Sequence, residues 1–129
     1  MASENGKKLP IILEGEVVHG KALGRTVGMP TANLHISCGE LPEVGVYATR
    51  IKIDDKVFNS VTNVGRRPTV DEEEQITVET YILDYAEDIY GKNVVLEVCR
   101  FLRPVKKFHN LEEVHEQVER DIVEARKYF

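Results

Sequence analysis

The sequence lacks several features that mark large classes of proteins. Its 129 residues contain no tryptophan and only two cysteines, Cys38 and Cys99, which lie far apart in the chain. Two distant cysteines without a Cys-x-x-Cys motif form neither a disulfide framework nor a zinc site, so we expect both to be reduced packing residues. The four histidines show no paired ligand spacing. No transition-metal site is therefore expected.

Long apolar segments are also missing. No run approaches the roughly 18 consecutive apolar residues that a membrane span requires, and the opening MASENGKKLP has no apolar stretch like that of a secretory signal. The formal charge is −5, which disfavours nucleic acid as the main partner because that binding relies on Lys and Arg. We therefore expect a cytoplasmic protein without membrane or nucleic-acid partners.

The residues that are present describe a folded protein of one domain. Hydrophobic residues make up 42% of the chain and charged residues 30%, values close to the average for globular proteins. Residues 1–9 are polar and are predicted to form a flexible tail. Residues 10–129 are predicted to form the domain, which has no internal repeat or linker.

Most of the chain has the pattern of β-strands. Short apolar and β-branched runs alternate with clusters of Gly, Pro, Asp and Asn, a pattern typical of an antiparallel sandwich or barrel. We expect a mainly β fold, a compact antiparallel barrel of Greek-key type with about six strands and a C-terminal helix, since closure removes sheet edges. The clearest runs are Ile11–Val18, Val46–Ile53, Val57–Val64, Gln75–Asp84 and Asn93–Phe101.

The end of the chain changes to a helical period. Apolar residues recur there at steps of three and four, which places them on one face of a helix. Asn110 is suited as its N-cap, and Glu113 is placed to complete a capping box. The apolar face comprises Leu111, Val114, Val118, Ile122, Ala125 and Phe129.

A glycine-rich segment is the first candidate for chemistry. In GKALGRTVGMPTANL a glycine recurs every fourth residue with cations between, so the backbone can approach a phosphate closely. The segment is neither a Walker A loop nor a dinucleotide fingerprint. From the glycines alone, a flexible surface loop connecting two strands is the simpler explanation. The residues concerned are Gly20, Lys21, Gly24, Arg25 and Gly28.

Thr31 and Asn33 follow directly. Two residues apart on an extended segment, their side-chain oxygens project to the same side and can face one hard cation such as Mg²⁺. Neutral oxygens suit an ion that arrives on nucleotide phosphates, because it needs few ligands from the protein. The simpler alternative is that both residues cap a turn.

A second basic segment, NVGRRPT, runs from Asn63 to Thr69. A strand end followed by Gly65, Arg66, a second Arg and Pro predicts a stiff turn with two fixed positive charges. Such a turn can act as a flap over a ligand. It can also be a solvated hairpin tip.

Glu79 lies in the strand-like segment QITVETYILDY. Alternation places it on a half-apolar face with Tyr81 and Leu83. A carboxylate there can accept a proton from a substrate hydroxyl. The alternative is an exposed strand glutamate.

The segment RFLRPVKKF precedes the predicted helix. Arg103, Lys106 and Phe108 offer cations and an aromatic ring beside the helix N-terminus, a place suited to a planar ligand. Solvated basic loop residues are the alternative.

Taken in chain order, these motifs closely resemble those of riboflavin kinases, either monofunctional or as a domain of bifunctional riboflavin kinase/FAD synthetases. The resemblance extends from about Leu13 to Tyr128. It is carried by GMPTANL, GVYAT, NVGRRPT, TVETYILD, DIYG, FLRPVKKF and QVERDIVEAR.

The resemblance implies an enzyme that transfers the γ-phosphoryl group of ATP to the 5′-hydroxyl of riboflavin, giving FMN and ADP. We expect it to be a monomer. It implies Mg²⁺, or another divalent ion such as Zn²⁺ or Mn²⁺, as cofactor. By motif, Glu79 would be the catalytic base, and Thr31 and Asn33 would bind the metal. Thr31 and Asn33 would also help to hold ATP, together with Gly20, Lys21, Arg25 and Gly28. The flavin site would be lined by Arg103, Lys106 and Phe108, and a flap would be formed by Asn63, Gly65 and Arg66.

Two departures qualify the resemblance. Tyr81 stands where relatives commonly carry His, which affects the expected nucleotide contacts there but not Glu79. The chain also lacks the His-x-Gly-His of an adenylyltransferase module, so FAD synthesis is not expected of it.

Two other functions remain open at this stage. One is a flavin- or nucleotide-binding module without catalysis, against which the joint presence of Thr31, Asn33 and Glu79 argues. The other is an oligonucleotide-binding barrel, which is disfavoured by the acidic charge and by the lack of an evident row of strand aromatics.

Overall fold

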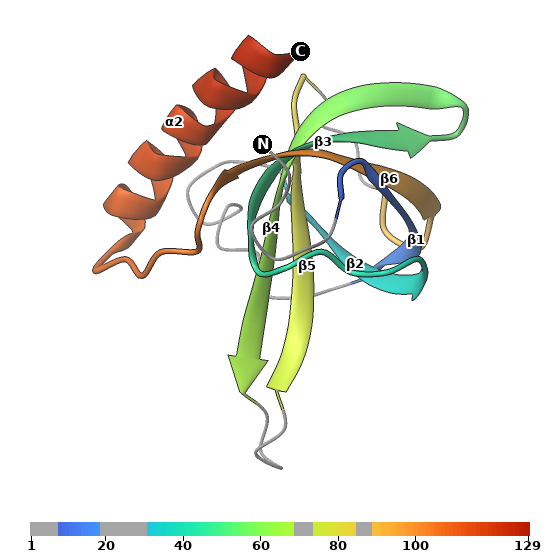
Figure 1. Cartoon of the computed structure of the whole chain (residues 1–129), viewed down its shortest axis with the longest axis horizontal. Helices are drawn as coiled ribbons and strands as arrows, with labels where there is room; N and C mark the ends of the chain where they lie inside the picture. The colour runs from blue at the N-terminus through green and yellow to red at the C-terminus, as the bar shows by residue number, and fades with distance from the viewer. Residues whose placement is uncertain (1–7, 19–30, 69–73, 85–88) are drawn as a thin grey trace.

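The computed structural model describes residues 8–18, 31–68, 74–84 and 89–129 (Figure 1). Most of the predicted tail and the glycine-rich residues Gly20, Lys21, Arg25 and Gly28 therefore lie outside the described residues. The elements are β1 (Ile11–Val18), β2 (Thr31–Cys38), β3 (Gly45–Ile53), β4 (Lys56–Pro68), β5 (Glu74–Ile82), β6 (Asn93–Arg103) and α2 (Leu111–Tyr128).

The strands close into a barrel in the order β1-β2-β5-β4-β3-β6. Every neighbouring pair is antiparallel, and β1 closes the barrel by pairing with β6. Closure leaves no unpaired sheet edge within these strands. The predicted mainly β fold, an antiparallel barrel with a C-terminal helix, is confirmed.

Strand alternation fills the barrel with apolar side chains. Successive residues of a strand point to opposite faces, so every second residue enters the interior. This packed interior makes the barrel a solid support rather than a ligand cavity. Its buried members are Leu13, Val17, Ala32, Leu34, Tyr47, Ile51, Ile53, Val64, Val78, Ile82, Ile89, Val94, Leu96 and Val98.

Four hydroxyl side chains form a chain of hydrogen bonds across β3, β4 and β5. Thr49 Oγ1 lies 2.6 Å from Ser60 Oγ and 2.9 Å from Thr62 Oγ1, and Thr62 Oγ1 lies 2.9 Å from Thr80 Oγ1. All four residues have no exposed surface. Because a hydroxyl both donates and accepts, this hydroxyl ladder satisfies its own polar groups inside the protein.

The helix α2 covers the outer face of β3 and β4 (Figure 1). Ala125 is fully buried there, and the cluster includes Ile122, Ala125 and Phe129 of the predicted apolar face. The helix carries charge on its other faces, as an amphipathic surface helix does. The cluster joins Val46, Ala48, Val61 and Ala125 with the partly buried Tyr81, Leu102, Ile122 and Phe129.

The start of α2 follows the predicted cap with one difference. Asn110 Oδ1 accepts a hydrogen bond from the backbone N–H of Glu113 at 2.9 Å. The Glu113 carboxylate accepts from the backbone N–H of His109 at 2.9 Å, one residue before the cap. The cap is confirmed, whereas the reciprocal bond of the capping box shifts to His109.

Two segments differ from the prediction. Thr31–Cys38 forms β2, which was not among the predicted runs, although Thr31 and Asn33 were expected to be extended. The predicted turn from Asn63 to Thr69 is wrong for its described part, because β4 continues to Pro68 and pairs with β5 as far as Glu74. The two strands project together beyond the barrel (Figure 1).

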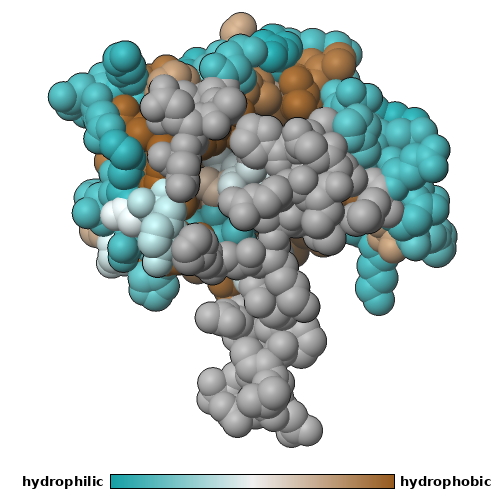
Figure 2. Space-filling model, turned by 180° about the vertical axis from the view of Figure 1, so that it is seen from behind, coloured by the Kyte–Doolittle hydropathy of each residue, from teal (hydrophilic) through white to brown (hydrophobic). Residues whose placement is uncertain are grey.

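Hydrophilic residues cover much of the described surface, and hydrophobic residues gather in the upper part of the view from behind (Figure 2). Large hydrophobic residues that are more than half exposed come from different elements. Isolated residues of this kind are normal and mark no docking surface. They are Ile12, Val57, Tyr90 and Val123.

Candidate active site

Three residues predicted from separate motifs form one row across the outside of the barrel. Glu79 on β5 stands opposite Asn33 on β2 and, on its other side, opposite Asn63 on β4. Residues directly opposite in adjacent strands project to the same face. That face is the outer one, because Val78 and Thr80, which flank Glu79, are buried in the interior.

A second row lies two residues along the same strands. Thr31 stands opposite Tyr81, and Tyr81 stands opposite Val61. Thr31 and Asn33 are thus on the same side of β2, as the sequence predicts. The base candidate Glu79 therefore has both metal-ligand candidates on the neighbouring strand.

The environment of Thr31 fits a cation. Its Oγ1 atom is buried and has no hydrogen-bond partner among the described residues. A buried hydroxyl normally finds a partner, and a metal ion can fill that role. Oε2 of Glu79 is buried as well. The hydroxyl of Thr31 and the amide of Asn33 together offer the hard oxygen ligands that Mg²⁺ takes.

Tyr81 lies between the base candidate and the helix. Burial is the main cause that raises the pKa of Tyr81 above its usual value, followed by the negative charges of Glu79 and of Asp121 on α2. The phenol therefore stays neutral at physiological pH and can take part in hydrogen bonds without adding charge. The site is bounded on this side by α2.

Arg103 connects the end of β6 to the helix. It stands opposite Val46, which in turn stands opposite Asn63. Its Nε and Nη2 donate to Oδ1 and Oδ2 of Asp121 at 2.7 and 2.8 Å, and its Nη1 donates to the carbonyl of Pro104 at 3.0 Å. The guanidinium predicted to contact flavin is thus held by a two-point ion pair.

The comparison with protein families decides the assignment. The model of the flavokinase family, described as riboflavin kinase, matches residues 7–129. The chain belongs to the riboflavin kinase family. Members of this family use ATP as co-substrate together with a divalent metal ion.

Curated relatives of this chain are longer proteins. It is 37% identical over 123 residues to the bifunctional riboflavin kinase/FMN adenylyltransferase of Bacillus subtilis, covering 93% of this chain and 39% of the relative. The protein of the same description from Escherichia coli K12 is 38% identical over 121 residues, with 93% and 38% covered. The chain therefore spans about two fifths of the length of these relatives.

Solved structures agree with the barrel. A Streptococcus pneumoniae protein described as a macrolide-efflux protein superposes with a TM-score of 0.84 and 34% identity, covering 91% of this chain and 38% of that one. Riboflavin kinase from Trypanosoma brucei superposes with a TM-score of 0.60 and 22% identity, covering 95% and 79%. The second likeness supports the fold alone.

The flavin-site candidates of the riboflavin kinase motif lie on the segment between β6 and α2. Lys106 Nζ lies 5.8 Å from the centroid of the Phe108 ring and donates to Oε1 of Gln117 at 3.4 Å. Lys106 is exposed and Phe108 is half-buried. The cation and the ring therefore lie beside the first turns of the helix, where the sequence placed them.

The flap candidates are strand residues. Gly65 stands opposite Thr77, and Arg66 stands opposite Ile76, on the part of β4 that follows Asn63. Asn63 belongs to the row with Glu79, whereas Gly65 and Arg66 lie farther along the projecting strands. Their role as a flap remains a prediction.

Sequence reasoning missed Asp121 as a residue near the site. In the sequence, Asp121 is only one of the many charged residues of the amphipathic C-terminal helix. Its four-residue spacing from Gln117 was the available signal, because residues i and i+4 share a helix face. The structure shows it 4% exposed, and a buried carboxylate needs a partner.

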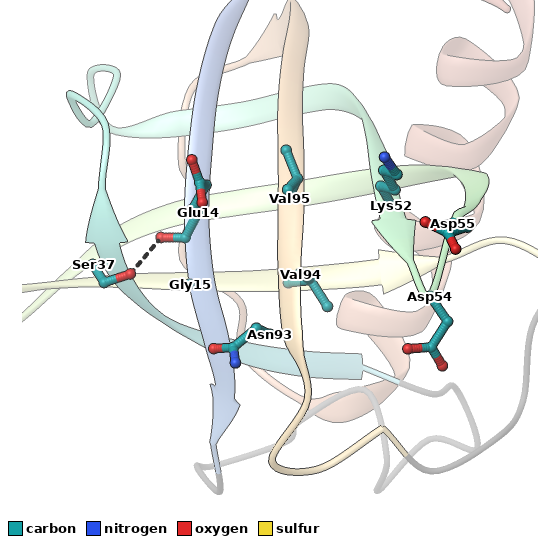
Figure 3. A pocket seen from close by; sticks show the side chains of 9 residues that line it. All are labelled: Glu14, Gly15, Ser37, Lys52, Asp54, Asp55, Asn93, Val94 and Val95. Carbon is teal, nitrogen blue, oxygen red and sulfur yellow. Dashed lines mark hydrogen bonds between the residues drawn. The ribbon is translucent and has the colours of Figure 1, made fainter.

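A separate pocket lies on the far side of the barrel. It has a volume of about 310 Å³ (Figure 3) and is lined by residues of β1, β2, β3 and β6 and of the turn after β3. Ser37 Oγ donates to the carbonyl of Glu14 at 3.3 Å beside it. It contains none of the predicted site residues. Its lining is Glu14, Gly15, Ser37, Lys52, Asp54, Asp55, Asn93, Val94 and Val95.

The described part of the chain contains no group of three or more His, Cys, Asp or Glu side chains able to hold a metal. None of its helices is long and apolar enough to cross a bilayer. Cys38 and Cys99 are free thiols.

Proposed function

We propose that this chain is a riboflavin kinase domain that transfers the γ-phosphoryl group of ATP to the 5′-hydroxyl of riboflavin, releasing FMN and ADP. One observation carries the proposal. The strand pairing brings Asn33, Glu79 and Asn63 into one row with Thr31 beside it, although these residues come from separate motifs. Membership of the riboflavin kinase family supports the choice of substrate.

Glu79 is the proposed general base. Phosphoryl transfer depends mainly on alignment and charge stabilisation, and a carboxylate that accepts the hydroxyl proton contributes typically ~10²–10⁴-fold in rate. Glu79 is held by a strand that is paired on both sides. A strand in the middle of a sheet offers a fixed position, which proton transfer to a positioned group requires.

Thr31 and Asn33 are the proposed metal ligands. A bound Mg²⁺, or another divalent ion such as Zn²⁺ or Mn²⁺, would neutralise phosphate charge during transfer. The protein's part is to hold the hydroxyl of Thr31 and the amide oxygen of Asn33 on one side of β2. Both ligands are neutral, which suits an ion that keeps phosphate and water oxygens.

The remaining assignments complete the proposal. ATP would be held by the glycine-rich segment, and the flavin ring would lie against the segment that follows β6, because a planar, largely uncharged ligand calls for an apolar contact with few polar groups. Asn63, Gly65 and Arg66 would cover the nucleotide. The ATP residues are Gly20, Lys21, Arg25 and Gly28, and the flavin residues are Arg103, Lys106 and Phe108.

We further propose that the chain acts as a monomer on these two small molecules in the cytoplasm, without nucleic-acid or membrane partners. The acidic charge of −5 and the two free thiols support this setting. Gel filtration with light scattering measures the mass in solution, and a dimer mass would contradict the monomer.

The deciding experiment incubates the protein with riboflavin, ATP and Mg²⁺ and follows FMN by chromatography. The wild type should form FMN, and Glu79→Gln should bind riboflavin but turn over at least ~10²-fold more slowly. The matched control is Glu14→Gln, because Glu14 is an exposed strand glutamate on β1. This variant should keep the wild-type rate. Binding of flavin without any turnover by the wild type would assign a binding module instead.

A further inference from the structure

Three polar residues of α2 recur at four-residue spacing and each binds one residue of the segment that leads into the helix. We call this segment, residues 103–109, the strap. Its contacts run antiparallel to the helix, because each later strap residue pairs with an earlier helix residue. In order, they join Arg103 to Asp121, Lys106 to Gln117 and His109 to Glu113.

The first of these contacts has the geometry of a strong ion pair. Arg103 donates from two nitrogens to the two oxygens of Asp121 at 2.7 and 2.8 Å, the bidentate arrangement in which Arg–carboxylate pairs are most specific. Asp121 is 4% exposed. Gln117 Nε2 donates to Oδ1 of Asp121 at 3.1 Å. The carboxylate is thus satisfied by one strap residue and one helix residue.

Gln117 links two of the contacts. Its Nε2 binds Asp121, and its Oε1 accepts from Lys106 Nζ at 3.4 Å. One amide therefore couples the buried ion pair to the exposed lysine, which lies against the ring of Phe108. The side chains expected to meet the flavin are held by residues that do not themselves belong to the predicted site.

The same carboxylate is adjacent to the proposed catalytic strand. Asp121 is close enough to Tyr81 for its charge to help raise the pKa of the phenol, and Tyr81 lies two residues after Glu79. Asp121 is therefore paired with the strap and also near enough to Tyr81 on β5 for its charge to be felt there.

We propose that Asp121 and Gln117 are positioning residues that hold the strap in the conformation that binds riboflavin. This inference rests on the proposed function. Most of the strap has no regular secondary structure, and ordering a loose segment on binding weakens affinity. Because Asp121 and Gln117 fix the strap to α2 before the flavin binds, they would reduce this loss of riboflavin affinity. The affinity for ATP would be unaffected.

The test compares steady-state constants for Asp121→Asn and Gln117→Ala with those for Glu124→Gln. Glu124 is exposed on the same helix and pairs with Lys127, so its variant controls for loss of a helix carboxylate. Asp121→Asn should raise the riboflavin KM by about tenfold or more, and Gln117→Ala by about threefold or more. The kcat and the KM for ATP should stay within about twofold of wild type.

Two further measurements separate positioning from a purely structural role. The riboflavin affinity of Arg103→Gln, Asp121→Asn and the double variant should be strongly non-additive if Asp121 acts through Arg103. A variant that lowers kcat and raises both KM values together, or that changes only the melting temperature, would overturn the proposal. If Asp121→Asn does not fold, the milder Gln117→Ala carries the test.

Failure of the proposed function would be recognised separately. A wild-type protein that forms no FMN removes the kinase assignment. Hydrogen exchange of the strap amides still tests its fixation, and Asp121→Asn should increase exchange at residues 105–109 relative to Glu124→Gln. Unchanged exchange would show that Asp121 does not hold the strap.

Discussion

Neighbouring residues of β5 have opposite tasks. Glu79 faces outward in the row with Asn33 and Asn63, whereas Thr80 faces inward and joins the hydroxyl ladder. The residue proposed as the general base and a residue that supports the fold are therefore adjacent in the chain. A substitution at one should affect rate, and at the other stability.

At the scale of the single residue, the variant Asn33→Ala tests the proposed metal ligand Asn33. Loss of the amide oxygen should raise the Mg²⁺ concentration needed for half-maximal rate, and the KM for Mg-ATP, by about tenfold or more, because removing one ligand weakens a site that has few. The riboflavin KM should change little. The measurement is a Mg²⁺ titration of FMN formation.

Asn93→Ala is the matched control for that experiment. Asn93 is exposed at the start of β6 and lines the pocket on the far side of the barrel (Figure 3). It should show the wild-type Mg²⁺ dependence. Identical titrations for both variants would remove Asn33 from the metal shell.

At the scale of the element, the N-cap of α2 has a measurable contribution. Asn110→Ala removes the oxygen that accepts the Glu113 N–H at 2.9 Å and should lower the free energy of unfolding by about 1 kcal/mol. Asn110→Ser keeps a capping oxygen and should lose much less. Urea denaturation followed by circular dichroism measures both, and equal losses would rule out the cap as the cause.

The hydroxyl ladder ties three strands together. Thr62 binds both Thr49 and Thr80, so Thr62→Val leaves two buried hydroxyls with one partner fewer and should lower the free energy of unfolding by about 1–3 kcal/mol. Thr77→Val on the outer face of β5 is the control, with a loss below ~0.5 kcal/mol. A loss at Thr77 as large as that at Thr62 would contradict the ladder's role.

The elements were predictable where their pattern was local. The bounds of Ile11–Val18 and the apolar face of the C-terminal helix follow from alternation and period. Thr31–Cys38 also alternates, but its polar positions hid the strand. Gly65 and Pro68 are typical turn residues, yet β4 includes Gly65 and ends only at Pro68. A proline at the end of a strand interrupts no continuing ladder of hydrogen bonds.

The site was predictable only as a set of candidates. Sequence motifs and the family resemblance nominated Asn33, Glu79 and Asn63, but their alignment in one row depends on the register between strands that are distant in sequence. Register is set by turns and by burial of one face of each strand. Identifying Asp121 as a neighbour of the site required knowing how α2 packs on the barrel, which no local pattern of the helix specifies.

For the whole molecule, two tyrosines predict a loss of stability in alkali. Burial and Glu43 raise the pKa of Tyr47, and burial with Glu79 and Asp121 raises that of Tyr81. Above pH 10.0, the usual value, the unfolded chain loses these protons while the folded protein keeps them. The free energy of unfolding should therefore fall as pH rises beyond 10.

Urea denaturation at pH 8 and near pH 10.5 measures that fall. Tyr81→Phe should lessen the difference between the two pH values, because it removes one of the groups that binds its proton more tightly in the folded protein. Tyr90→Phe, at an exposed tyrosine, should leave the difference unchanged. An equal fall in the wild type and Tyr81→Phe would contradict the assignment.

A filled barrel whose proposed catalytic and metal-binding residues lie on its outer wall has a consequence for variation. Selection for heat resistance can exchange interior residues such as Val78 and Leu96 for others of similar volume. Selection for faster turnover would act instead on the residues of the outer wall. The two kinds of adaptation can thus accumulate independently. A shift of β5 by one residue in its pairing register would change stability and turnover together, because it would turn Glu79 inward and Thr80 outward at once.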